Sequence, residues 1–243
     1  SRRGFSPSLR GVDFEYPSLG HRYSESNSII KANFSDSNSV TIYLNSKEEH
    51  LFALFQKSNR YITSNSSVSV IHQDILNVMP AVERLQVHER TLRENYVKAN
   101  LNSRLAPLHF RNQIYFLKDV HDWTQIKNRA YYEEDIYYPT QYEIFVDLAE
   151  SSWPGLRIMN LERVTTSPPE LTLLVRDGSF VLEVGRVGSG LQAWLQTCWF
   201  LARCPRQSVV VLDEPDTFLH PDLQRRLYKL VEGYFDQIII ATH

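Results

Sequence analysis

Short apolar runs separated by polar clusters characterise the first part of the chain. Residues 28–71 contain the runs SIIKANF, SVTIYL, HLFALFQ and SVSVI, with the clusters SDSNS and SNSS between them. Such runs, punctuated by Ser, Asn and Asp, are typical of antiparallel hairpins. The pattern predicts a β meander here. Residues 1–27 are rich in Ser, Gly and Arg without periodicity, so we expect a loop there.

The middle of the chain is charged, and its apolar positions follow helical spacing only in part. Over residues 81–118 these positions are Val82, Leu85, Val87, Leu92 and Val97. We expect two helices in this region, separated by Pro107. Another helix should follow Pro139, with the sequence YEIFVDLAES. The aromatic, acidic stretch 131–138 is expected to be a partly buried structural segment, with a protein–protein surface as the alternative.

Apolar runs of strand length and helix length alternate in the last third. LTLLVRDGSFVLEV predicts a hairpin that turns at Asp177-Gly178. It is followed by an apolar helix (GSGLQAWLQTCWFLAR), a buried strand (SVVVLDE), an amphipathic helix with Pro221 near its start, and a second buried strand (DQIIIATH). The order helix, strand, helix, strand predicts a parallel α/β sheet.

Composition changes this picture little. The chain has 243 residues, of which 42% are hydrophobic and 22% charged, and a formal net charge of -2. These values are ordinary for a globular protein and give no overall basic field for nucleic acid. No apolar run approaches the roughly 18–20 residues of a membrane span. The two thiols, Cys198 and Cys204, lack metal-site spacing, and so few cysteines favour a reducing, cytoplasmic location.

Two carboxylates end the first buried strand of the last third. Asp213 and Glu214 follow the apolar run 209–212, and ligands of open α/β sheets bind at the carboxyl ends of strands. An Asp at this place can hold Mg²⁺, usually through water, and the next carboxylate can polarise an attacking water as general base. The alternative is a solvated acidic turn capping an ordinary strand.

Two further features agree with a phosphate site. Gly188, Ser189 and Gly190 come directly before a helix, where backbone N–H groups bind anions; a plain helix cap is the alternative. His243 ends the second buried strand and could reach a γ-phosphate, although a lone His there is more often a packing or surface residue.

Together these motifs resemble the ABC-class ATPase heads, which include transporter nucleotide-binding domains, SMC proteins, RecF and the OLD-type ATPases. By this resemblance Ser189, Gly190 and Gln192 match the signature motif, which binds nucleotide. Asp213 matches the Walker B aspartate, Glu214 the catalytic glutamate and His243 the switch histidine. The segment DEPDTFLHP looks like the DEPxxxLHP form of RecF/OLD-like ATPases rather than the DEPTSALD form of transporters.

The resemblance implies an α/β fold: an ABC-type ATPase head with a mixed sheet, an antiparallel β subdomain and an inserted helical lobe. The expected divisions are a loop over 1–27, the β subdomain over 28–80, a helical insert or lid over 81–150 and a C-terminal ATPase lobe over 151–243. It also implies ATP and Mg²⁺ as cofactors, and a homodimer that sandwiches ATP. The expected partner is a nuclease, another effector or DNA, in anti-phage defence or DNA repair. A nucleotide-gated scaffold or clamp with little turnover is the alternative.

Some family parts cannot be placed. No Lys follows any of the nine glycines, so a GxxxxGK[ST] loop is not found, and we expect it before residue 1. We therefore expect this chain alone to bind ATP very weakly. Gln73 is the first candidate for the Q-loop glutamine, and Gln113 is the second. Basic residues of 81–118 could bind DNA, but interleaved Glu residues make a solvated helix the more natural interpretation.

Overall fold

The computed structural model describes residues 28–33, 39–45, 50–57, 60–61, 76–101, 103, 105–120, 139–204, 209–235 and 237–242. The chain divides into two compact units, residues 1–73 and 74–243.

The first unit contains an antiparallel sheet. Its strands pair in chain order: β1 (Ser28–Asn33), β2 (Ser39–Asn45), β3 (His50–Lys57) and β4 (Arg60–Tyr61). The predicted meander is confirmed for these strands. The run SVSVI, at residues 67–71, and the loop expected over 1–27 lie outside the described residues.

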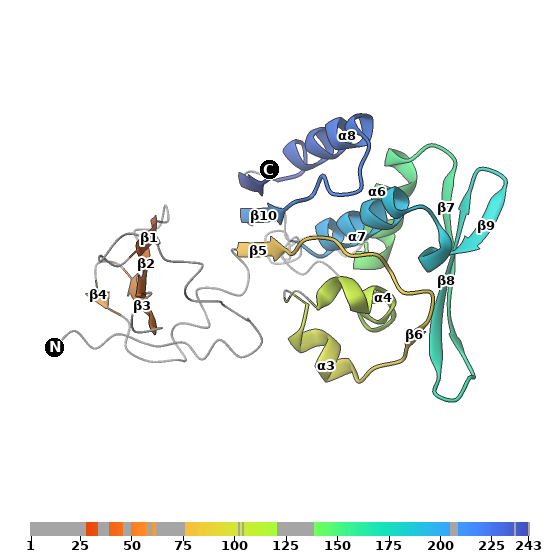
Figure 1. The fold of residues 1–243 in the computed structure, drawn as a ribbon, viewed down its shortest axis with the longest axis horizontal. Helices are drawn as coiled ribbons and strands as arrows, with labels where there is room; N and C mark the ends of the chain where they lie inside the picture. Colours follow the sequence, from red (N-terminus) through yellow and green to blue (C-terminus); the bar gives the residue numbers. More distant parts are fainter. Residues whose placement is uncertain are drawn as a thin grey trace, which may run out of the picture. The chain divides into compact units, whose positions relative to one another are not determined.

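A three-stranded parallel sheet forms one end of the second unit (Figure 1). Its order is β11 (Gln237–Ala241), β10 (Val209–Asp213) and β5 (Leu76–Met79). Leu212 of β10 is fully buried and lies between Ile240 and Met79 in register. The predicted parallel arrangement of the two buried strands is confirmed, and β10 is the central strand.

An antiparallel sheet lies at the other end of this unit (Figure 1). Its strands are β6 (Glu89–Arg90), β7 (Leu156–Val164), β8 (Glu170–Asp177) and β9 (Phe180–Glu183), with β8 paired to the other three. The hairpin predicted at Asp177-Gly178 is confirmed. Gly178 has a φ of 59°, a left-handed conformation that glycine adopts without a steric cost.

Helices lie between and beside the two sheets of this unit (Figure 1). They are α3 (Glu94–Ala99), η1 (Ala106–His109), α4 (Phe110–Leu117), α6 (Gln141–Ser152), η2 (Val184–Arg186), α7 (Ser189–Arg203) and α8 (Pro221–Glu232). In α7 every residue from Leu191 to Ala202 is buried, and Figure 1 shows this helix running through the middle of the unit. The helix expected after Pro139 is α6. No helix in the described parts of the chain is long and apolar enough to cross a membrane.

The prediction of helix over the start of 81–118 was wrong for residues 81–93. This extended segment contains no helix, and it pairs with another strand only at β6. Its backbone groups bond to distant side chains instead of to each other. The carbonyl of Glu83 accepts from Gln196, and that of Gln86 accepts from Arg111. Long-range partners satisfy the buried backbone here, so a helix is not needed for that purpose. Pro107 lies in η1, between α3 and α4, as expected.

Candidate functional site

Asp213 and Glu214 lie at the carboxyl edge of the parallel sheet. Asp213 is the last residue of β10 and is exposed. The backbone N–H of Glu214 donates to the carbonyl of Ala241, at the end of β11, over 2.8 Å. Glu214 also has a φ of 45°, which is uncommon for a residue other than glycine. The chain therefore turns sharply as it leaves the sheet, and both residues stay at the edge where α/β sheets bind ligands.

The turn after Glu214 is held by its own hydrogen bonds. The N–H of Thr217 donates to the carbonyl of Glu214 at 3.1 Å, and that of Leu219 to the carbonyl of Asp216 at 3.0 Å. Gln224, in the first turns of α8, donates its amide to the carbonyl of Leu219 at 3.0 Å. Phe218 has a φ of 66°, so the turn contains a second non-glycine residue in the left-handed region. Such a conformation persists only where surrounding contacts hold it.

This turn is also tied to the end of β11. Thr242 donates its hydroxyl to the carboxylate of Asp216, with 3.0 Å to each oxygen. Thr242 directly precedes His243, which lies outside the described residues. The proposed role of His243 thus stays a prediction, but the residue before it is anchored to the turn that follows Asp213 and Glu214.

The glycine-rich loop meets the same turn. Helix α7 begins at Ser189 with Gly188 as its N-cap, and Ser189 and Gly190 are half-buried. A Cβ at Gly190 would lie only 3.2 Å from the carbonyl oxygen of Phe218. The turn and the N-terminus of α7 are therefore in close contact. The first turn of a helix presents unpaired N–H groups to an anion.

Gln192 lies one turn into α7 and is buried at 6% exposure. Its side-chain oxygen accepts from the N–H of Leu85 at 2.8 Å, and its nitrogen donates to the carbonyls of Gly185 and Val187 at 3.2 and 2.9 Å. The amide is thus fully used within the protein. In this conformation Gln192 holds the loop before Ser189, and a contact to a nucleotide stays a prediction.

Of the two candidates for the Q-loop glutamine, the structure describes only Gln113. Gln73 is outside the described residues. Gln113 is buried in α4, where its amide donates to the carbonyl of Ala106 at 2.6 Å and accepts from the indole of Trp199 at 3.1 Å. These contacts give Gln113 a packing role in the core.

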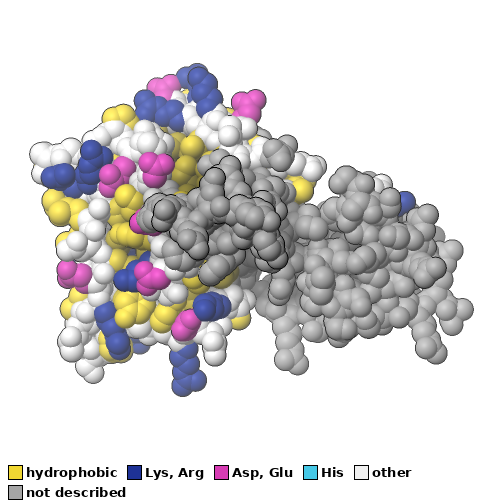
Figure 2. Space-filling model, turned by 180° about the vertical axis from the view of Figure 1, so that it is seen from behind, with side chains coloured by type: hydrophobic (Ala, Val, Ile, Leu, Met, Phe, Trp, Pro, Cys, Tyr) yellow, Lys and Arg dark blue, Asp and Glu magenta, His cyan; other side chains and the backbone are white. Residues whose placement is uncertain are grey.

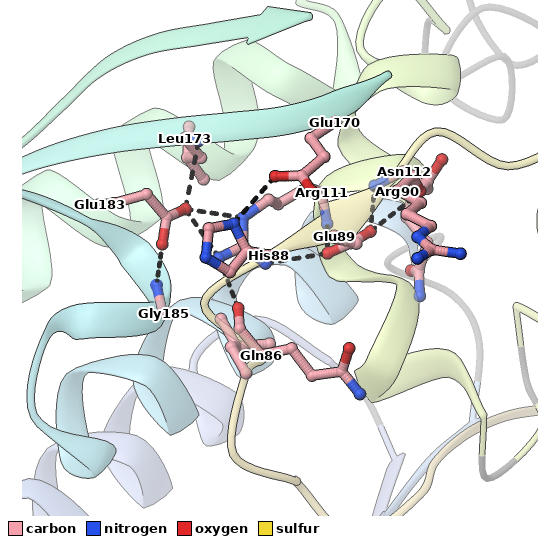
Figure 3. A network of polar contacts seen from close by, with 12 residues as sticks. Gln86, His88, Glu89, Arg90, Arg111, Asn112, Glu170, Leu173, Glu183 and Gly185 are labelled. Atoms are coloured by element: carbon pink, nitrogen blue, oxygen red, sulfur yellow. Dashed lines mark hydrogen bonds and ion pairs between the residues drawn. The ribbon is translucent and has the colours of Figure 1, made fainter. Parts of the chain in front are cut away.

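A buried ion-pair network around Arg111 is not predicted by the sequence patterns (Figure 3). Arg111 is 0% exposed and lies between the carboxylates of Glu89 and Glu183, 3.0 and 2.7 Å from them. Its guanidinium also donates to the carbonyl of Gln86 at 2.8 Å. The signal available in the sequence was a lone Arg in the otherwise uncharged helix FRNQIYFL, because a charge is buried only with partners.

The carboxylates at the sheet edge fit a nucleotide-bound Mg²⁺. No group of three or more His, Cys, Asp or Glu side chains forms a ready-made metal site in the described part of the chain. Mg²⁺ usually takes one or two protein carboxylates and completes its shell with water and phosphate oxygens. Asp213, exposed at the edge beside Glu214, meets that requirement.

The surface of the described residues carries charges of both signs. On the face seen in Figure 2, Lys and Arg side chains lie among Asp and Glu side chains. In the region proposed for DNA contact, Lys98 pairs with Glu94 at 2.6 Å. This mixing is typical of a solvated surface.

One protein-family model covers most of the chain. A protein-family model described as "AAA domain, putative AbiEii toxin, Type IV TA system" matches residues 7–243. No curated protein matches the chain.

Two solved structures of SMC heads are similar at low identity. One is titled "Crystal structure of the SmcHead bound to the C-winged helix domain of ScpA", with 11% identity, a TM-score of 0.49, and coverage of 88% of this chain and 65% of that one. The other is the SMC head domain from Thermotoga maritima, with 10% identity, a TM-score of 0.44, and coverage of 90% and 65%. The chain thus spans about 65% of the length of these heads.

Proposed function

The chain belongs to the family of AAA domains whose model it matches over residues 7–243, and we propose that in the complete protein it binds and hydrolyses ATP as an ABC-class head. The observation that carries the proposal is the convergence of three segments at one edge of the parallel sheet. These are the Asp213–Glu214 pair, the turn that follows it, and the N-terminus of α7. Carboxylates for a metal and water, and N–H groups for an anion, are the chemistry that phosphoryl transfer needs. A homodimer would bring the carboxylates of one head to the N–H groups of the other.

Each group has a definite role in this proposal. Asp213 would hold Mg²⁺, directly or through a water ligand, and Glu214 would orient and deprotonate the attacking water. Ser189 and the N–H of Gly190 bind the γ-phosphate of a nucleotide held mainly by the partner head of a homodimer. His243 contacts a γ-phosphate as well. The proposal places the phosphate-binding loop of each head outside residues 1–243, so ATP affinity belongs to the complete protein.

Hydrolysis would then change the state of a partner. Loss of the γ-phosphate removes the contacts that hold two heads together, and a ligand can shift an equilibrium only through such differential contacts. The DEPDTFLHP sequence supports a place among RecF/OLD-like ATPases, whose partners are nucleases, other effectors or DNA. In this chain His220 and Pro221 of that sequence begin α8, with His220 as the N-cap.

A scaffold that binds nucleotide with little turnover is the second candidate. The same site geometry supports it, because a clamp also needs the signature loop and the metal carboxylate. Only the general base distinguishes the two functions. Direct DNA binding by the region of α3 and α4 has weaker support, since its charges are mixed; salt-dependent DNA affinity of the complete protein would be its signature.

Substitution of Glu214 by Gln tests the enzymatic proposal. We expect ATP turnover by the complete protein to fall about 10²- to 10⁴-fold, because a general base contributes about that much, while nucleotide binding persists. Phosphate release and nucleotide titration measure the two quantities. Glu232→Gln, at the exposed end of α8, is the matched control and should retain turnover.

Unchanged turnover in the Glu214→Gln protein would rule out Glu214 as the base. Turnover that is negligible even in the unsubstituted protein, with nucleotide binding intact, would favour the scaffold.

A further inference from the structure

A closed ring of hydrogen bonds surrounds the loop that leads into Ser189. Starting from Arg111, Nη2 donates to the carbonyl of Gln86, and Nε donates to Glu183 Oε1 at 2.7 Å. Glu183 Oε2 accepts from the N–H of Gly185 at 2.7 Å. The carbonyl of Gly185 accepts from Gln192, which in turn accepts from Leu85, the residue next to Gln86. Each hydrogen bond of the ring involves a side chain, and the peptide bond between Leu85 and Gln86 closes it. The ring therefore links α4, the extended segment 81–93 and the loop before Ser189.

Space inside the ring is filled. A Cβ at Gly185 would overlap the carbonyl oxygen of Gln86 and lie 2.8 Å from Arg111 Nη2. Arg111 itself is wholly buried, and Glu89 anchors its other side at Nη1 and at its backbone N–H, both 3.0 Å away. Glu89 is held in turn by Asn112. These contacts hold the guanidinium in one position (Figure 3). Through Glu183, which accepts from the N–H of Gly185, it also holds the loop that leads into Ser189.

We propose that Arg111 is a positioning residue for the signature loop: it sets where Ser189 and Gly190 lie, and thereby controls turnover on the partner head's nucleotide. This inference rests on the proposed function of the same site. Only Arg can do this at position 111, because its planar fork bonds Glu89, Glu183 and the carbonyl of Gln86 together, whereas a Lys ammonium is a single point. A small displacement of a group that contacts the reacting phosphate is expected to affect turnover strongly.

Arg111→Lys tests the proposal because it keeps the buried charge and removes the fork. In the complete protein we expect kcat for ATP to fall about 10- to 100-fold, with KM for ATP within about twofold, since each nucleotide is held mainly by the head opposite the signature loop. Arg157→Lys is the matched control: Arg157 pairs with Glu150 at 3.1 Å but is 55% exposed, and surface pairs contribute little. Its kcat should be unchanged.

Mixing variants separates positioning from a general folding defect. Mixed dimers of Arg111→Lys with Glu214→Gln contain one site with an intact signature loop and an intact base, so activity should exceed the sum of the two variants. Mixed dimers of Arg111→Lys with Ser189→Ala have a defective signature loop at both sites, so activity should not recover.

Three outcomes would overturn the proposal. An unchanged kcat in Arg111→Lys would show that the ring is not needed for turnover. Recovery with Ser189→Ala but not with Glu214→Gln would place the defect in the head's own nucleotide site. Recovery with neither, together with a lower melting temperature, would show a structural role only. In all three cases Glu214→Gln and Ser189→Ala would still lose activity if the proposed ATPase function is correct, so the two failures are distinguishable.

Discussion

At the scale of single residues, uncharged groups as well as carboxylates shape the candidate site. Gly190 allows the N-terminus of α7 to approach the carbonyl of Phe218. The side-chain amide of Gln192 forms hydrogen bonds with three backbone groups. A buried amide or glycine of this kind is needed for its shape and hydrogen bonds, and a substitution there leaves either a clash or an unpaired polar group.

Gly185→Ala should destabilise the second unit. The added methyl group would overlap the carbonyl of Gln86, and overpacking of a tight site costs about 1–3 kcal/mol. Denaturant unfolding followed by Trp fluorescence measures the change in the free energy of unfolding. Gly188→Ala is the control, because its Cβ meets no atom within 4 Å, and its effect should stay below about 1 kcal/mol. Equal effects of the two substitutions would show that the ring around Gly185 is not tightly packed.

At the scale of elements, local sequence signals and tertiary packing agree for most of the second unit. Helix α6 begins with a complete capping box, in which Thr140 accepts from the N–H of Glu143 and Glu143 accepts from the N–H of Thr140. Helix α8 begins with Pro221 after the N-cap His220, where the missing N–H of proline is not needed. The extended segment 81–93 differs, because its partners are distant in sequence.

Thr140→Ala should weaken α6 without altering the core. The change removes the N-cap hydrogen bond, which is worth about 1 kcal/mol, and α6 packs its buried Phe145 against Trp199 at 5.6 Å between ring centroids. We expect a loss of about 1 kcal/mol in the free energy of unfolding, measured by urea denaturation. Thr140→Ser, which retains the hydroxyl, should lose much less. A Ser variant as unstable as the Ala variant would mean that the cap is not the cause.

At the scale of the whole chain, the described residues of the candidate site belong to the second of the two units. The described part of residues 1–73 is an antiparallel sheet, and the residues proposed for hydrolysis that the structure describes all lie in the unit 74–243. The core of that second unit is built around α7, which the parallel sheet and the other helices cover. Both cysteines belong to this core and are free thiols.

Stability of the chain should fall as the pH rises above about 8.5. Burial raises the pKa of the Cys198 thiol and of the Cys204 thiol to about 12, whereas thiols of the unfolded chain ionise near pH ~8.5. Between these values the unfolded chain has released the protons that the folded chain retains, so unfolding becomes more favourable with rising pH. Urea unfolding on either side of the lower pKa, at about pH 8 and about pH 10, measures this difference.

The double variant Cys198→Ala/Cys204→Ala is the control for that measurement. It should be less stable at both pH values, because it leaves small cavities, but its stability should depend less on pH. The same pH dependence in both proteins would show that other groups cause it. Native thiols should also resist alkylation until the chain unfolds.

The sequence by itself determined the strands and helices of the last third, the hairpin turn, and the acidic pair and glycine loop that suggest phosphate chemistry. Hydrophobic periodicity and short motifs predict these features, because both depend on residues that are close together in the sequence. Only the tertiary structure decided that segment 81–93 is extended, and that Gln192 bonds to the loop before Ser189. It also decided that Arg111 pairs with both Glu89 and Glu183. Leu85 and Gln192 are 107 positions apart, and a hydrogen bond over such a separation depends on how the elements pack, which no local pattern encodes.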